Sequence, residues 1–206
     1  MHVKRIVVGP LASNCYLVRC SDNGEALVID PGAEPEVILK QLEMEGLTLR
    51  YIINTHGHGD HIGANAALKE LTGAAILIHA GDAPMLTSAV KNLSAWLDGG
   101  IVSPPADRTL ADGDELRCGD VVFKVLATPG HTPGGISILG PGVVFTGDTL
   151  FQGSIGRTDF PGGSFTVLLK SIREKLLILP DETLVYPGHG PATSIGREKM
   201  ENPFLQ

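Results

Sequence analysis

Short apolar runs recur along the chain, and clusters of Gly, Pro, Asn and Asp separate them. Runs of about four to eight apolar or β-branched residues with such boundaries are typical of buried strands. The runs that predict strands are residues 3–8, 15–18, 26–29, 49–53, 74–78, 116–118, 121–127, 136–139, 143–145 and 184–186. The first three predict a meander, and the short turns after residues 118 and 139 predict two hairpins.

Helical spacing of apolar residues predicts three helices. One covers residues 35–45, where Pro35 suits the first turn, and another covers residues 64–71 and ends at Gly73. The clearest pattern begins at a Ser164 cap and stops at Pro180. Its apolar residues follow i, i+3, i+4, i+7 and i+11 spacing and are Phe165, Leu168, Leu169, Ile172 and Leu176.

Residues 81–108 carry a mixed pattern. A helix is indicated by the spacing of Met85, Ala89, Leu93 and Leu97, whereas the later Ser-Pro-Pro at residues 103–105 indicates a loop. The segment is either a cap over a site or a connector, and the pattern leaves both possibilities open.

Length and composition set the scale of the fold. A chain of 206 residues, 43% of them hydrophobic, is long enough for one well-buried core. We therefore expect residues 1–206 to form a single domain. Aromatic residues make up only 5% of the chain, which predicts an aliphatic core.

Charge and targeting signals exclude several classes of partner. The formal net charge is −7 and the chain has no run of Lys and Arg, so we expect no nucleic-acid partner. The apolar run after Lys4 and Arg5 stops at Gly9-Pro10, which is too short for a signal peptide or a membrane span. We expect a cytoplasmic protein with no membrane partner, and the oligomeric state is unknown.

The cysteines predict no role in a site. They are three in number, an odd count, and none forms a Cys-x-x-Cys pair. Neither a disulfide framework nor a thiolate zinc site is therefore indicated, and idle or buried thiols are expected.

The stretch Thr-His-Gly-His-Gly-Asp-His at residues 55–61 concentrates candidate metal ligands. His56, His58, Asp60 and His61 can all bind a metal, and the two glycines between them let the backbone fold tightly. Residues two apart in an extended loop point the same way, so the first two histidines can hold one ion. The other two side chains point elsewhere, which favours half of a two-metal site over a single ion.

Three further candidate ligands each follow an apolar strand. They are His131, Asp148 and His189. Both histidines stand in a Pro-Gly-His frame, in which Pro fixes φ and Gly permits a sharp turn. Ligands that end several strands converge if those strands end at one edge of the core.

Charge and number divide these ligands between two ions. His56, His58 and His131 form one group, and Asp60, His61 and His189 form the other. Asp148 is left, and its two oxygens can bridge both ions. Two cations lower the pKa of a shared water and polarise a substrate carbonyl, so the chemistry implied is hydrolysis. Asp60 is also a candidate catalytic residue that orients this water or accepts its proton.

These motifs resemble the metallo-β-lactamase superfamily: a His-x-His-x-Asp-His motif, then His, Asp and His, in the family's order. The resemblance implies an α/β fold, a four-layer αβ/βα sandwich with a dinuclear site at one edge of its two sheets. It also assigns the same seven ligands. Two divalent metal ions are expected as cofactors, zinc first, with iron or manganese as the alternatives.

Within the superfamily the chain is similar to the glyoxalase II branch, especially its short bacterial members, through residues 146–151, 156–161 and 202–205. Members hydrolyse S-(2-hydroxyacyl)glutathione, typically the D-lactoyl thioester, so a small-molecule thioester is the implied substrate. Full-length members continue into helices whose basic residues hold the glutathione carboxylates, and we expect this chain to lack that C-terminal extension. Arg157 is a candidate for substrate binding, with pairing to Asp159 or support of the loop as the alternatives.

Four other functions are weaker interpretations. Asp148 counts against a true β-lactamase, because those enzymes usually carry Cys or Ser at the bridging position. The runner-up is a mononuclear iron persulfide dioxygenase, whose iron would use His56, His131 and Asp148, and whose Gly-Arg-Thr-Asp-Phe stretch resembles residues 156–160. Purely structural metals are disfavoured, because seven ligands on two ions leave open positions. A nuclease of the superfamily is disfavoured by the acidic charge.

Overall fold

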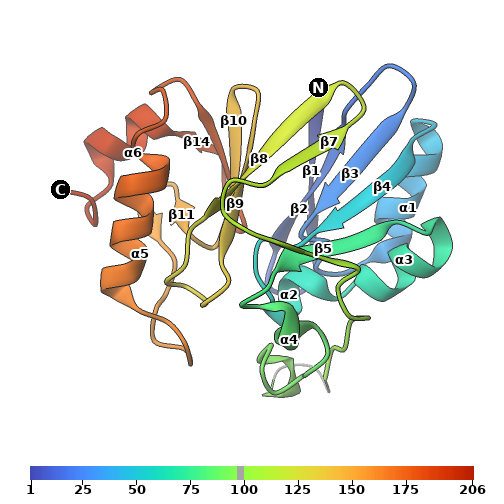
Figure 1. The fold of residues 1–206 in the computed structure, drawn as a ribbon, viewed down its shortest axis with the longest axis horizontal. Coiled ribbons are helices and arrows are strands. Elements are labelled where there is room, and N and C mark those ends of the chain that lie inside the picture. Colours follow the sequence, from blue (N-terminus) through green and yellow to red (C-terminus); the bar gives the residue numbers. More distant parts are fainter. Residues whose placement is uncertain (97–99) are drawn as a thin grey trace.

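Alternating side chains on the strands pack into different layers. On strand β2 (Ser13–Arg19), Tyr16 and Val18 join one buried cluster, whereas Cys15 and Leu17 join another. Successive residues of a strand point to opposite faces, so a strand buried on both faces requires a layer on each side. The computed structural model describes residues 1–96 and 100–206 and has these layers: two sheets packed face to face, with helices outside each (Figure 1).

The first sheet contains the N-terminal half of the chain. Its order is β1-β2-β3-β4-β5-β6, with antiparallel pairing from β1 to β3 and parallel pairing from β3 to β6. The strands are β1 (His2–Val8), β2, β3 (Glu25–Ile29), β4 (Thr48–Ile53), β5 (Ala75–His79) and β6 (Arg108–Leu110). The helices α1 (Pro35–Met44) and α3 (Asn65–Thr72) cover its outer face, and the short α2 (Gly59–Ile62) follows β4.

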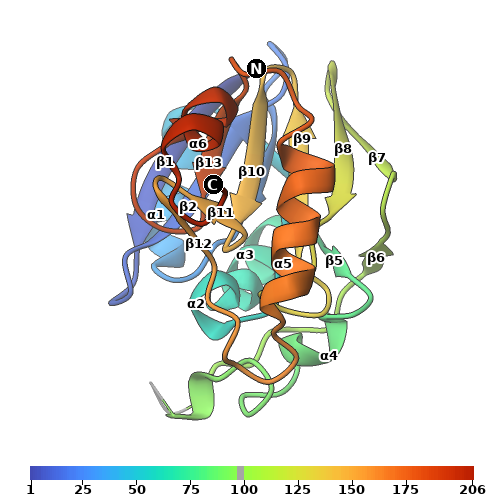
Figure 2. The same cartoon turned by 90° about the vertical axis from the view of Figure 1, so that its left-hand side faces the viewer.

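The second sheet contains the C-terminal half. Its order is β14-β13-β10-β9-β8-β7, and only the β10–β13 pair is parallel among the described strands. The strands are β7 (Glu115–Cys118), β8 (Val121–Ala127), β9 (Ile136–Gly140), β10 (Val143–Gly147), β13 (Leu184–Pro187) and β14 (Thr193–Ser194). The hairpin β11 (Leu150–Phe151) and β12 (Ser154–Ile155) follows β10. The turned view shows α5 (Phe165–Ser171) and α6 (Ile195–Glu201) outside this sheet (Figure 2).

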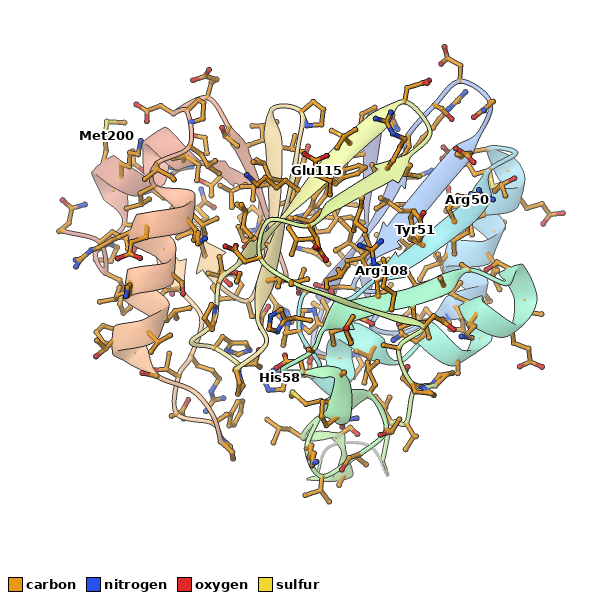
Figure 3. The ribbon with its side chains drawn as sticks, in the orientation of Figure 1. Arg50, Tyr51, His58, Arg108, Glu115 and Met200 are labelled. Atoms are coloured by element: carbon orange, nitrogen blue, oxygen red, sulfur yellow. The ribbon has the colours of Figure 1, made fainter. Side chains whose placement is uncertain are left out.

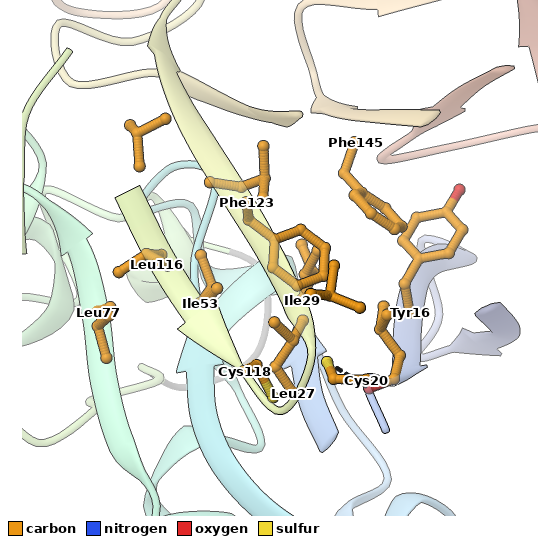
Figure 4. Close-up of a cluster of buried hydrophobic side chains, with 14 of the residues drawn as sticks. Tyr16, Cys20, Leu27, Ile29, Ile53, Leu77, Leu116, Cys118, Phe123 and Phe145 are labelled. Atoms are coloured by element: carbon orange, nitrogen blue, oxygen red, sulfur yellow. Dashed lines mark hydrogen bonds between the residues drawn. The ribbon is translucent and has the colours of Figure 1, made fainter. Parts of the chain in front are cut away.

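The core between the two sheets concentrates the few aromatic residues. Phe145 of the second sheet packs on Tyr16 of the first, with ring centroids 5.2 Å apart, and Phe123 of the second sheet belongs to the same buried cluster (Figure 4). Most of the other buried side chains in this cluster are aliphatic, as the composition predicts, but the three largest buried rings stand at the contact of the sheets and the half-buried Tyr186 stacks on Phe145. Large rings fill the space between two sheets that side chains of one sheet alone cannot fill.

The helix expected over residues 164–180 differs from its prediction in its last turns. Ser164 caps α5 as expected, but residues Ile172–Leu176 form a wider π-type turn, in which Leu177 N donates to Ile172 O at 2.9 Å. Ile172 and Leu176 stay fully buried. The apolar pattern reports this burial and does not distinguish i+4 from i+5 bonding, so it predicts one uninterrupted helix.

The other predicted elements are confirmed with small shifts of their ends, both hairpins included. The short strands β6, β11, β12 and β14 and the helices α2 and α6 were missed in the sequence. Among the described residues of 81–108, only α4 (Ala83–Leu86) and a 3₁₀ turn at Ser94–Trp96 are helical, so Met85, Ala89 and Leu93 do not lie on one helix. Leu97, the last of the spaced apolar residues, lies outside the described residues. The four-layer α/β fold predicted from the resemblance is confirmed. In the described part of the chain, no helix has the length and apolarity that crossing a membrane requires.

We predict that Phe123→Ala lowers the free energy of unfolding by about 3–5 kcal/mol, because it leaves a cavity between the sheets. Urea denaturation monitored by circular dichroism measures this loss. Phe165→Ala is the matched control, because Phe165 is 50% exposed whereas Phe123 is fully buried. Equal destabilisation of the two variants would show that the contact between the sheets is not the main core.

Candidate metal centre

Strands from both sheets end at one edge of the molecule and bring the seven predicted ligands together. β4 leads into the loop of His56 and His58, and α2 then carries Asp60 and His61. The chain after β8 supplies His131, the chain after β10 supplies Asp148, and the chain after β13 supplies His189. Figure 3 shows His58 at this edge, between the two halves of the fold. Carboxyl ends of strands that point to one edge bring distant residues into contact.

The first ligand group consists of His56, His58 and His131. One nitrogen of each lies within 4.8 Å of the others, and His131 Nε2 is 3.0 Å from His58 Nδ1. All three side chains are buried. Three nitrogens that converge at this spacing match the ligand set of a divalent ion such as zinc.

The second ligand group consists of Asp60, His61 and His189. Asp60 Oδ2 lies 3.3 Å from His61 Nε2 and 3.2 Å from His189 Nε2. The group therefore offers one carboxylate oxygen and two imidazole nitrogens to a common point. These are the donors that the sequence assigned to the second ion.

Asp148 lies between the two groups. Its Oδ1 is 3.5 Å from His61 Nε2, and its Oδ2 is 3.6 Å from His131 Nε2 and 3.7 Å from His189 Nε2. The carboxylate thus faces ligands of both groups, as a bridging residue requires. A Cβ on Gly188 would come within 2.2 Å of Asp148 Oδ1, so the Pro-Gly-His turn needs its glycine for space.

Several of these donor atoms are buried without a hydrogen-bond partner. Within the described residues this holds for His56 Nε2, His61 Nε2 and Asp148 Oδ1. A buried polar atom without a partner costs free energy, so its presence in a native fold calls for an explanation. Two divalent ions would supply the missing partners, and the His and Asp clusters fit a dinuclear metal site.

Burial and mutual charge set the protonation of the ligands. Burial lowers the pKa of His58 to about 3 and lowers the pKa of His56 as well, so both rings are neutral near pH 7 and keep a nitrogen lone pair. Burial opposes ionisation of Asp60, but His61 and His189 outweigh it and lower the pKa of this carboxyl. His56 and His58 are therefore neutral imidazoles, and the second group carries a carboxylate.

Asp30 supports the second group and was missed in the sequence. This buried residue accepts hydrogen bonds from Thr55 N at 2.7 Å and Thr55 Oγ1 at 2.6 Å, and its Oδ2 lies 3.2 Å from His61 Nδ1. A carboxylate behind an imidazole ligand fixes the orientation of the ring. Asp30 follows β3 at the same edge as the ligands, and this position was the signal that could have identified it.

Asp82 joins two ligand loops and was also missed. Its Oδ2 accepts from Gly57 N at 3.1 Å, and its Oδ1 accepts from Gly134 N at 2.6 Å. Gly57 stands between His56 and His58, and Gly134 stands three residues after His131, so one buried carboxylate holds both sides of the first group. No motif marks Asp82, because its partners are backbone groups far away in the sequence.

Strand β2 holds the loop of His189. Asn14 Nδ2 and Tyr16 Oη donate to Pro187 O at 2.8 and 2.7 Å, and Asn14 N donates to Gly188 O at 2.7 Å. His189 Nδ1 lies 3.1 Å from Leu11 O. The second strand of the chain therefore positions the last of the seven ligands.

Arg157 lines the cavity beside the ligands. Its carbonyl oxygen lies 2.7 Å from His131 Nδ1, which orients that ring through the backbone. Its guanidinium pairs with both oxygens of Asp159 at 2.7 Å, the alternative that the sequence raised. Contact of Arg157 with substrate stays a prediction.

A cavity of about 670 Å³ opens over the ligands and gives a small molecule access to them. His58, Asp60, His131, Asp148 and His189 all contribute to its wall. The arrangement can therefore present a substrate to both ligand groups at once.

Comparison with known proteins agrees with this geometry. The family model described as the metallo-beta-lactamase superfamily matches residues 8–189. "Probable metallo-hydrolase YqgX" of Bacillus subtilis is 41% identical, over 100% of this chain and 98% of its own. "Hydroxyacylglutathione hydrolase GloC" of Haemophilus influenzae is 39% identical, again over 100% of this chain and 98% of its own.

Solved structures are similar over nearly the whole fold. The BLEG-1 B3 metallo-beta-lactamase has a TM-score of 0.95 and 41% identity and covers 100% of both chains. TTHA1623 in a di-iron-bound form has a TM-score of 0.88 and 40% identity, over 98% of this chain and 100% of its own. ETHE1 from Myxococcus xanthus has a TM-score of 0.79 and 37% identity, over 98% of this chain and 84% of its own.

We predict that Asp82→Asn weakens metal binding about 10- to 100-fold, the usual effect of losing a residue that orients metal ligands. The amide keeps one acceptor, and its NH₂ group faces a backbone N–H. Competition with a chromophoric chelator measures the affinity. The exposed Asp22→Asn is the matched control and should bind metal as the unmodified chain does. Unchanged affinity in Asp82→Asn would exclude this positioning role.

Proposed function

The chain belongs to the metallo-β-lactamase superfamily, and from this we propose that it is a metal-dependent hydrolase of a small-molecule thioester. The substrate class we propose is the 2-hydroxyacyl thioesters, and S-D-lactoylglutathione is the member that the resemblance and the GloC relative point to. The observation that carries the proposal is the position of Asp148, which faces both groups of three ligands. Two ions that share a bridging carboxylate form a site suited to hydrolysis.

The seven ligands would hold two divalent ions, zinc in the first instance. When bound, such a pair supplies a water of lowered pKa and Lewis-acid polarisation of the acyl oxygen. Iron is the main alternative, since one of the similar structures is described as di-iron-bound. In the balanced reaction, the water oxygen bonds to the acyl carbon, the carbon–sulfur bond breaks, and the departing thiol takes up a proton.

The chain's own residues orient the reactants. Ser13 Oγ donates to Asp60 Oδ2 at 2.9 Å, which leaves the other Asp60 oxygen for a water molecule. We assign Asp60 the orientation of that water and the acceptance of its proton. The carbonyl of Arg157 fixes the His131 ring, and the guanidinium of Arg157 is our candidate for contact with substrate at the cavity wall.

Two other activities are supported by particular observations. A mononuclear iron persulfide dioxygenase would use His56, His131 and Asp148, and the likeness to ETHE1 keeps this alternative open. A β-lactamase was disfavoured because of Asp148, yet a protein described as a B3 metallo-beta-lactamase is 41% identical over the whole chain. Oxygen consumption with a persulfide and hydrolysis of a chromogenic cephalosporin test these two activities in turn.

We predict that the purified, metal-analysed protein hydrolyses S-D-lactoylglutathione, that a chelator abolishes the activity, and that added zinc restores it. Loss of thioester absorbance measures the rate. Activity that survives complete metal removal would contradict the mechanism. A fully metallated protein that consumes oxygen, or opens a cephalosporin, and leaves thioesters intact would favour the corresponding alternative.

We predict that Asp148→Ala lowers kcat/KM on the order of a thousandfold, because the variant loses the carboxylate that faces both ligand groups. Metal content is measured alongside and should fall below two ions per chain. Asp22→Ala is the matched control and should keep full activity. Thermal denaturation establishes that both variants fold, and a folded, active Asp148→Ala would refute the bridging role.

A further inference from the structure

The cavity over the ligands is walled mainly by apolar side chains away from its metal-facing floor. Val8 and Leu11 come from β1 and the turn after it, Ile101 comes from the segment after α4, and Phe151, Ile155 and Phe160 come from the opposite side. These walls continue directly from His58 and His189, which line the same cavity. A substrate whose acyl group reaches the ligands must therefore lay its remaining part along apolar surface.

Polar side chains in these walls are already occupied. Asn92 Nδ2 donates to Ile101 O at 2.9 Å, and Asn92 Oδ1 accepts from Ser94 Oγ at 2.6 Å. Ser13 donates to Asp60, as described above. A polar group that is bonded within the protein gains little from a new partner, so these side chains do not replace the water that a charged ligand loses on entry.

The described side chains that line the cavity include no unpaired cation that could bind a substrate carboxylate. Among the described lining residues, Arg157 alone carries a permanent positive charge. Its Nε donates to Asp159 Oδ1 and one of its terminal nitrogens donates to Asp159 Oδ2. Its guanidinium carbon also lies 3.8 Å from the centre of the Phe160 ring, so it stacks on the apolar wall. The Arg157–Asp159 pair is neutral as a unit.

Resting on the proposed function, we propose that the thiol arm of the substrate is uncharged and apolar. Glutathione carries two carboxylates and an ammonium group, which need compensating partners when they leave water. An aryl or alkyl thiol needs none and gains free energy by covering the exposed Leu11 and the half-buried Phe151 and Phe160. The site thus hydrolyses S-D-lactoylglutathione but is built for 2-hydroxyacyl thioesters of apolar thiols.

The test compares three D-lactoyl thioesters that share one acyl group: those of benzyl mercaptan, 4-(mercaptomethyl)benzoic acid and glutathione. The first two differ by one carboxylate. We expect kcat/KM for the benzyl ester to exceed that for each of the other two roughly tenfold, after correction for their rates with hydroxide. Equal values, or a preference for glutathione, would overturn the inference and leave the thioesterase proposal intact. Failure of the fully metallated protein on all three esters would instead refute the thioesterase proposal.

Two variants test the contributions of the apolar walls and of Arg157 to kcat/KM separately. Leu11→Ser changes a side chain that is 48% exposed, so the fold should tolerate it. It should lower kcat/KM for the benzyl ester about three- to tenfold more than kcat/KM for the glutathione ester. Arg157→Gln should change the glutathione and carboxybenzyl esters no more than the benzyl ester. Selective loss of the two charged esters in Arg157→Gln would show that the arginine binds carboxylates and would contradict the inference.

Discussion

Removal of imidazoles and carboxylates from water costs free energy, and this chain concentrates that cost at one edge of two apolar sheets. Much of the surrounding structure serves to hold these groups in place. Tyr16 and Phe145 pack the sheets together just above the ligands, and the strand ends fix the direction in which each ligand leaves the core. A less rigid scaffold would let the ligands turn toward solvent, and the shared ligand geometry would be lost.

Rigidity at the edge comes from backbone contacts as well as from side chains. Asp82 ties the loop of His56 and His58 to the loop after His131, and Asp30 ties Thr55 to the His61 ring. Glycines permit the close approaches: a Cβ at Gly188 would overlap Asp148, and one at Gly134 would come within 2.4 Å of Asp82 N. The candidate ligands therefore depend on surrounding residues, Asp30 and Asp82 among them, that lie outside the seven predicted positions.

The sequence predicts most of the strands and the convergence of the seven candidate ligands at one edge, because both predictions depend on local patterns. Strand periodicity is local, and so is the rule that a turn after a strand carries a side chain to the sheet edge. Asp82 and the apolar cavity walls could not be predicted in this way. Asp82 binds backbone groups 25 and 52 residues away, and the walls combine residues from β1 to Phe160. The sequence offered the pairing of Arg157 with Asp159 only as one alternative. An Arg-x-Asp spacing does not show which other groups of the folded chain lie near the guanidinium.

The bonds from Asn14 and Tyr16 to the chain around Pro187 link the two ends of the protein. Contacts of such long sequence separation slow folding, because the entropy of closing a long loop is lost before the contacts form. During synthesis on a ribosome, the first sheet can pair once β6 has emerged, while His189 is still to be translated. At that stage the group of Asp60 and His61 still lacks His189. The set of seven candidate ligands is thus complete only when β2 binds the loop that follows β13.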